Sequence, residues 1–98
     1  MDRQQAIEIV KRYKAEIEPW INPTAVYLYG SHSRNEARED SDIDVAVVVS
    51  DLKADWLVVM PQLWKAGWKV NSLIEPVLIS EADPSPLYEV VMRDGVAV

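Results

Sequence analysis

Apolar residues recur at intervals of three and four near the start of the chain. This stripe contains Ile7, Val10, Tyr13 and Ile17. The spacing is typical of an amphipathic helix, which we expect over residues 3–18 with the stripe packed on a core. Asp2 and Gln5 have the spacing of a capping box at its start, and Pro19 is expected to end it.

Several later segments have the composition of β-strands. Runs rich in β-branched residues, Leu and Tyr predict strands over residues 25–29, 42–49 and 70–80, with a short final strand over residues 96–98. Within residues 42–49 both alternating faces are apolar beyond the aspartates, so this strand should be central and covered on both sides. Pro76 cannot donate a ladder hydrogen bond, which predicts an edge position or an irregularity.

The longest helix after the first is expected over residues 52–69. Pro61 should disturb it and can divide it into two short helices. The segment between Trp56 and Trp68 is apolar almost all the way round. Such a helix can be buried against the sheet, or part of it can form a partner interface, where Trp and Met are favoured.

Two shorter helices complete the prediction. Residues 31–38 lie between two strands and are expected to form the first. The second is expected from Ser85 as N-cap to about Arg93, with Pro86 at the first helical position and Gly95 as its stop.

Composition limits the classes of function. With 98 residues the chain is long enough for one domain with a modest core. A net charge of −6 argues against a broad nucleic-acid-binding surface. No run approaches the roughly 18 apolar residues of a membrane helix, and the start of the chain lacks the apolar segment of a signal peptide. The absence of cysteine is compatible with the cytoplasm, the location that we expect.

The candidate chemistry lies between the first two predicted strands. Gly30 allows close approach to the backbone, and Ser31 offers a hydroxyl where a helix should begin, a position that suits phosphate. Asp42 and Asp44 should project from the same face of a strand. Adjacent carboxylates repel one another unless a cation lies between them, and such hard oxygen ligands suit Mg²⁺. The stretch therefore indicates a phosphate cradle beside a magnesium site.

The aspartates allow two other interpretations. The spacing of Asp40, Asp42 and Asp44 mimics the start of an EF-hand loop, but the sixth position needs Gly and holds Val45, and a strand follows. Alternatively, Asp42 and Asp44 simply decorate a strand end. The Gly-Ser pair upstream makes that interpretation weaker.

A family resemblance rests on these residues. The matching positions are Gly30, Ser31, Arg34, Ala37, Arg38, Ser41, Asp42, Ile43 and Asp44. In this pattern the chain resembles the minimal nucleotidyltransferases of the DNA polymerase beta superfamily. The resemblance implies an α+β fold, a small mixed β-sheet flanked by helices, in a single domain over residues 1–98. It also implies transfer of a nucleoside monophosphate from an NTP with two Mg²⁺ ions.

The resemblance assigns roles to six residues. Those implied to bind the nucleotide are Gly30, Ser31 and Arg34. Those implied to bind metal and to serve catalysis are Asp42, Asp44 and Glu75. The chain departs from the family pattern at two positions. Asn35 replaces a glycine, and it tolerates left-handed backbone better than most residues. Glu75 stands where the third acid is often Asp, and an exposed strand end is its alternative explanation.

Other polar residues near the motif have open interpretations. Arg38 would face the same way as Arg34 on a helix and either contacts phosphate or belongs to a solvated surface. His32 either touches phosphate or is a solvent-exposed bystander. Tyr27 and Tyr29 are interpreted as strand packing rather than catalytic groups.

Three functions follow from these features. The first is transfer of a nucleotide, expected to be AMP from ATP, onto a hydroxyl of a helical HEPN-type toxin. The protein would then be an antitoxin, a role that many proteins of the family it resembles have. The second is a non-catalytic antitoxin that neutralises its partner by binding, through the segment between Trp56 and Trp68, which can also mediate oligomerisation. The third is a hydrolase that uses the same metal site with water as acceptor.

Overall fold

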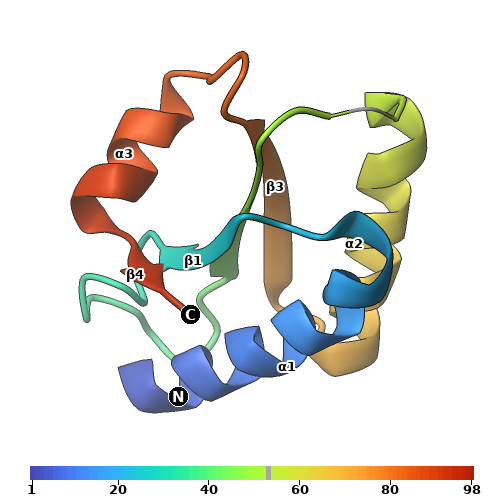
Figure 1. The fold of residues 1–98 in the computed structure, drawn as a ribbon. Coiled ribbons are helices and arrows are strands. Elements are labelled where there is room, and N and C mark those ends of the chain that lie inside the picture. The colour runs from blue at the N-terminus through green and yellow to red at the C-terminus, as the bar shows by residue number, and fades with distance from the viewer. Residues whose placement is uncertain (53) are drawn as a thin grey trace.

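A four-stranded mixed sheet forms the centre of the computed structural model, which describes residues 1–52 and 54–98 (Figure 1). Position 53, at the start of the helix predicted over residues 52–69, lies outside the described residues. The elements are, in chain order, α1 (Arg3–Ile21), β1 (Ala25–Tyr29), β2 (Ile43–Val49), α2 (Trp56–Val70), β3 (Ile74–Ser80), α3 (Leu87–Asp94) and β4 (Val96–Ala97). This arrangement confirms the predicted α+β fold with helices flanking a small mixed sheet.

The sheet has the strand order β3-β2-β1-β4. β2 runs parallel to β3 and antiparallel to β1, and β4 pairs antiparallel with β1. β2 is therefore internal, as the apolar character of both its faces predicted. β3 lies at the edge of the sheet, as Pro76 indicated.

Each face of β2 belongs to a different layer of the core. Ile43, Val45, Val47 and Val49 pack in one cluster with the buried residues of α1 and α2. Ala46 and Val48 pack on the other face with Val91 of α3. Figure 1 shows α3 on the other side of the sheet from α2, so the sheet is covered on both sides.

Two helices continue through prolines that were expected to end or divide them. α1 reaches Ile21 with Pro19 inside it, and α2 is one helix with Pro61 inside it. Each proline removes the hydrogen bond to the carbonyl four residues earlier. Those carbonyls belong to Ala15 and Leu57, both exposed residues, so water can replace the lost bonds. The buried faces of both helices outweigh the local cost.

The helix predicted over residues 31–38 does not form. Residues 30–35 make consecutive turns instead, and Asn35 has a left-handed backbone with φ of 58°. A residue in that conformation cannot continue a right-handed helix. The left-handed conformation that was expected of Asn35 is therefore confirmed, and it prevents a helix from continuing to residue 38.

Other element ends differ from prediction by a few residues. α2 begins at Trp56, where the Asp55 side chain caps the helix by accepting from the Leu57 N–H at 2.9 Å. β2 begins at Ile43, so Asp42 lies just before it, and β3 begins at Ile74 because α2 extends to Val70.

The ends of α3 agree only in part with the sequence interpretation. The Ser85 side chain does not cap the helix: Pro86 occupies the N-cap position and makes no side-chain hydrogen bond. The Gly95 N–H bonds to the Val91 carbonyl at 2.7 Å and ends the helix as expected.

No helix in the described part of the chain is long and apolar enough to cross a membrane.

Candidate active site

Three polar side chains form a row across the sheet. Tyr29 is the register partner of Asp44, and Asp44 is the register partner of Glu75. Register partners on neighbouring strands project from the same face. The row therefore runs from the end of β1 across the beginnings of β2 and β3, and Asp42 lies two residues before Asp44. The structure thus brings together the three acids that the sequence singled out.

The row lies on the face of the sheet that α3 covers. Tyr27, Tyr29 and Val77 pack against the small cluster that includes Val91 of α3. Asp42 is exposed, whereas Asp44 and Glu75 are half-buried. The carboxylates are therefore reached by solvent at one end and bounded by the small cluster at the other.

Burial and mutual repulsion act on these carboxylates together. Burial, followed by the charge of Asp42, raises the pKa of Asp44, and His32 and Arg34 partly oppose that rise. Burial also raises the pKa of Glu75, with further contributions from the charges of Asp42 and Asp44 and a hydrogen bond with Asp42. Ionised carboxylates held this close favour a bound cation.

The negative charge of the acids also affects the pKa of Tyr29. Burial, then the charges of Asp44 and Glu75, raises the pKa of Tyr29 to about 12. Its phenol therefore stays protonated at neutral pH beside the acids. The strand packing that the sequence predicted for Tyr29 is confirmed, since Tyr29 packs against the small cluster. Its register with Asp44 could not be read from the sequence.

Gly30 lies directly against Asp44. Its backbone has φ of 75°, a left-handed conformation that favours glycine, and a Cβ at this position would overlap the Asp44 carboxylate. The Gly30 carbonyl accepts from the Ser33 hydroxyl at 2.8 Å and from the Arg34 N–H at 3.2 Å. The turn and the acid are thus in contact, although they are separated along the chain.

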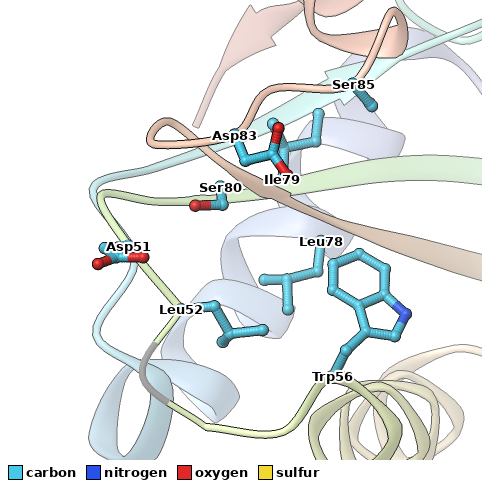
Figure 2. Close-up of a pocket in the computed structure, with 8 residues that line it drawn as sticks. All are labelled: Asp51, Leu52, Trp56, Leu78, Ile79, Ser80, Asp83 and Ser85. Atoms are coloured by element: carbon cyan, nitrogen blue, oxygen red, sulfur yellow. The ribbon is translucent and has the colours of Figure 1, made fainter.

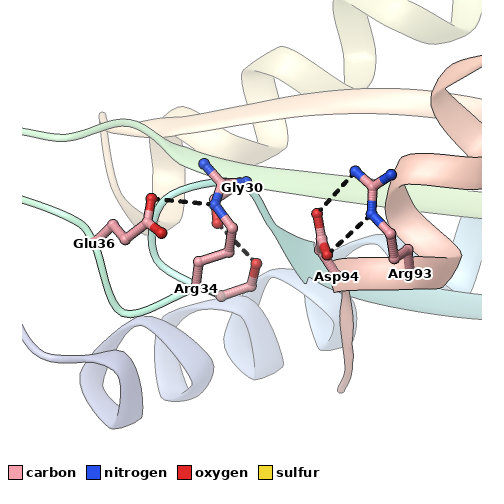
Figure 3. A network of polar contacts seen from close by, with 6 residues as sticks. Gly30, Arg34, Glu36, Arg93 and Asp94 are labelled. Carbon is pink, nitrogen blue, oxygen red and sulfur yellow. Dashed lines mark hydrogen bonds and ion pairs between the residues drawn. The ribbon is translucent and has the colours of Figure 1, made fainter.

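The other predicted nucleotide-binding residues belong to the same turn. Ser31 is half-buried, and its carbonyl accepts from the Glu36 N–H at 2.9 Å. Figure 3 shows Arg34 beside Gly30, with its guanidinium Nε 3.3 Å from a Glu36 carboxylate oxygen. A second ion pair in that view joins Arg93 to Asp94 at 3.3 Å. Because Arg34 lowers the pKa of Asp44, its charge acts on the carboxylate site.

Arg38 and His32 differ from their predicted settings. Arg38 is exposed, and without a helix over residues 31–38 the argument that it faces the same way as Arg34 fails. His32 is buried, with only 2% of its surface exposed, so the interpretation of a solvent-exposed bystander was wrong.

The donor set fits a divalent cation by its chemistry, but it is not a closed cage. Carboxylate oxygens are the ligands that Mg²⁺ prefers, and their mutual repulsion gives a cation a reason to bind. Within residues 1–52 and 54–98, no three His, Cys, Asp or Glu side chains converge closely enough to hold a metal unaided. Mg²⁺ is usually held by one or two carboxylates, with substrate phosphates and water completing its shell. The observed acids match that open kind of site.

Two cavities lie away from the acids. Figure 2 shows the first, of about 300 Å³. It is lined by Asp51, Leu52, Trp56, Leu78, Ile79, Ser80, Asp83 and Ser85. These residues follow or end β2 and β3, whereas the acids lie where those parallel strands begin. The second, of about 350 Å³, is an apolar hollow on the outer side of α2.

The fold is that of a polymerase beta-like nucleotidyltransferase. Residues 4–98 match the family described as "Polymerase beta, Nucleotidyltransferase", and the chain belongs to that family. It is 26% identical over 98 residues to the "Putative protein adenylyltransferase" of Methanocaldococcus jannaschii, covering 96% of this chain and 99% of that protein.

Solved structures of related proteins agree. A structure described as a "putative minimal nucleotidyltransferase" superposes with a TM-score of 0.64 at 28% identity, covering 100% of this chain and 97% of the other. A "toxin-antitoxin with AMP-PNP" structure superposes with a TM-score of 0.65 at 20% identity, covering 99% of this chain and 72% of the other. At that lower identity the second likeness shows the fold alone.

Proposed function

We propose that this protein transfers AMP from ATP to a hydroxyl of a partner protein, with Mg²⁺ held by the acids that begin β2 and β3. The observation that carries the proposal is the contact between Gly30 and Asp44, because it places a glycine turn, which another group can approach closely, directly beside a carboxylate of the kind that binds metal. The family membership and the name of the methanogen relative support the class of reaction.

The proposed roles follow from position. The Gly30 turn and the Ser31 hydroxyl bind the terminal phosphates, and Arg34 adds positive charge at the same turn. Asp42, Asp44 and Glu75 supply the oxygen ligands for the cations. Divalent cations bound there would neutralise charge on the triphosphate and on the departing pyrophosphate.

The reaction is a substitution at the α-phosphorus. The acceptor hydroxyl oxygen forms a bond to the α-phosphorus. The bond between the α-phosphorus and the oxygen that bridges to the β-phosphate breaks, and pyrophosphate leaves. Glu75 accepts the hydroxyl proton, a role that suits a carboxylate whose pKa is raised by burial and by neighbouring acids. Most of the rate enhancement comes from positioning and charge stabilisation.

For the acceptor we propose a helical HEPN-type toxin, which would make this protein an antitoxin. The likeness to a toxin–antitoxin structure that contains AMP-PNP supports this choice. The apolar surface of α2 offers a place for such a partner. We call it the α2 Trp surface, and it consists of Trp56, Leu57, Met60, Pro61, Trp64 and Trp68.

Label transfer from ATP labelled at the α-phosphate tests the reaction. The wild type with Mg²⁺ should label a protein in a lysate of the source organism, and Asp42→Asn/Asp44→Asn should not. Asp51→Asn is the matched control, because this exposed aspartate follows β2 at the other end of the strand. Equal labelling by the double variant would rule out the assignment of the acids. Free nucleotide in place of labelled protein would identify a hydrolase.

A second candidate function is neutralisation of the partner by binding alone. The exposure of the α2 Trp surface favours it, since Leu57 is 78% and Trp68 60% exposed. Exposed apolar patches of this kind mark interaction sites. Partner capture by the wild type without any transfer of label would support this function over catalysis.

A further inference from the structure

His32 makes a buried polar contact that the proposed chemistry does not use. It is the only histidine of the chain and immediately follows Ser31. Its Nε2 lies 3.3 Å from the carbonyl oxygen of Ser41, nine residues later. The ring is 2% exposed, so water offers little alternative to this contact.

The partner of the ring decides which nitrogen carries the proton. A backbone carbonyl can only accept a hydrogen bond, so Nε2 must be the donor. A buried polar group keeps its place when it is hydrogen-bonded and becomes costly when its partner is lost. The contact therefore keeps a proton on Nε2 of His32 and fixes the position of the Ser41 carbonyl.

Ser41 is held from two directions. Its hydroxyl accepts from the Arg38 N–H at 2.8 Å, and its own N–H donates to the Arg38 carbonyl at 3.1 Å. These bonds close a local turn, but they do not connect it to the rest of the site. The His32 contact makes that connection, and the residue after Ser41 is Asp42.

We propose that His32 is a positioning residue, which ties the Gly30 turn to the Ser41 carbonyl and so fixes the approach of Asp42 to the acid site. This role rests on the proposed function, because it matters only if Asp42 holds a cation. The charge effect of His32 on Asp44 supports the placement of the ring near the carboxylates. Substitution of a group that orients a metal-binding side chain typically changes metal affinity or activity by about 10–100-fold.

Two substitutions at this position separate the role from simple burial. His32→Gln puts an amide nitrogen near the place of Nε2, where it can still donate to Ser41. His32→Asn puts it near the place of Nδ1, where it cannot reach. We expect His32→Asn to lower the transfer rate and Mn²⁺ affinity by about 10–100-fold and His32→Gln to recover most of both. Equal loss in the two variants, or no loss in His32→Asn, would overturn the proposal.

Tyr13→Phe is the control for general destabilisation. It removes another buried side-chain bond to a backbone carbonyl, from the Tyr13 hydroxyl to Leu63 at 2.9 Å. This bond lies in the packing of α1 on α2, on the opposite face of the sheet from the acid row. The substitution should lower thermal stability without lowering Mn²⁺ affinity. A drop in Mn²⁺ affinity equal to that of His32→Asn would show that the His32 effect is only loss of stability.

Two readouts do not depend on catalysis. The ¹⁵N spectrum of the imidazole should show the proton on Nε2, and amide exchange over residues 38–42 should rise in His32→Asn but not in His32→Gln. An unprotonated Nε2, or unchanged exchange in His32→Asn, would contradict the positioning role. If both readouts agree with the positioning role but the wild type transfers no nucleotide, the proposed function would be contradicted instead.

Discussion

The Asp44 carboxylate occupies the space that a side chain at Gly30 would fill. Gly30 begins the turn after β1, and Asp44 is the second residue of β2, so the antiparallel pairing of these strands creates the contact. Replacing Gly30 should therefore disturb an acid of the site as well as the local backbone.

Gly30→Ala is expected to impair stability and transfer together. A left-handed backbone costs a residue with a Cβ roughly 1–2 kcal/mol, and the overlap with Asp44 adds to this. Displacement of a reacting group by about 1 Å can cost about 10²-fold in rate. Thermal unfolding and label transfer measure the two effects. In an Asp44→Ala background the stability loss should shrink to the backbone part, and an equal loss in both backgrounds would contradict the overlap.

Asp44→Asn should abolish transfer while stabilising the cation-free protein at neutral pH. The folded pKa of Asp44 is raised by burial and by Asp42. The associated stability is fully present below the unfolded pKa and is lost as pH rises through the folded pKa. At neutral pH the ionised carboxylate is therefore a cost that the amide avoids. The melting temperature of the variant should exceed that of the wild type at neutral pH, and the difference should shrink in mild acid. A lower melting temperature at neutral pH would contradict the repulsion.

Mg²⁺ or Mn²⁺ should stabilise the wild type at neutral pH. A ligand at about 100 times its Kd adds roughly 2.7 kcal/mol, and 1 kcal/mol corresponds to about 4–8 °C for a domain of this size. The shift should disappear in Asp42→Asn/Asp44→Asn and remain in Asp51→Asn. It should also fade in mild acid, as the carboxylates take up protons. An identical shift in the double variant would place the cation elsewhere.

Leu57→Glu should abolish partner capture without unfolding the protein. The Leu57 side chain is exposed on the α2 Trp surface, so a charge there meets solvent in the free protein but an apolar partner in a complex. Met92→Glu is a matched control on α3, since Met92 is also an exposed apolar residue. Pull-down and melting temperature measure the two effects. Unchanged capture by Leu57→Glu would exclude this surface.

The internal position of β2 could be predicted because local composition decides it. Val45, Val47 and Val49 face one layer and Ala46 and Val48 the other, and this alternation is visible along the chain. The Gly-Ser turn and the two aspartates were likewise recognisable, because their chemistry depends on spacing within one short stretch.

The effect of the prolines, by contrast, could not be predicted from the local sequence. Pro19 and Pro61 would weaken isolated helices, but burial of residues such as Ile17 and Leu63 supplies more stabilisation than one lost hydrogen bond removes. The helix predicted over residues 31–38 failed for the opposite reason, since the left-handed Asn35 and the tight Gly30 turn leave no room for regular helical bonds.

By itself the sequence determined the periodic elements, the family motif and the identity of the acids, because each depends on residues close together in the chain. Only the tertiary structure decided that Tyr29, Asp44 and Glu75 stand in one row and that His32 reaches Ser41. Strand register and burial are set by packing between distant segments, and that packing carries no local signal.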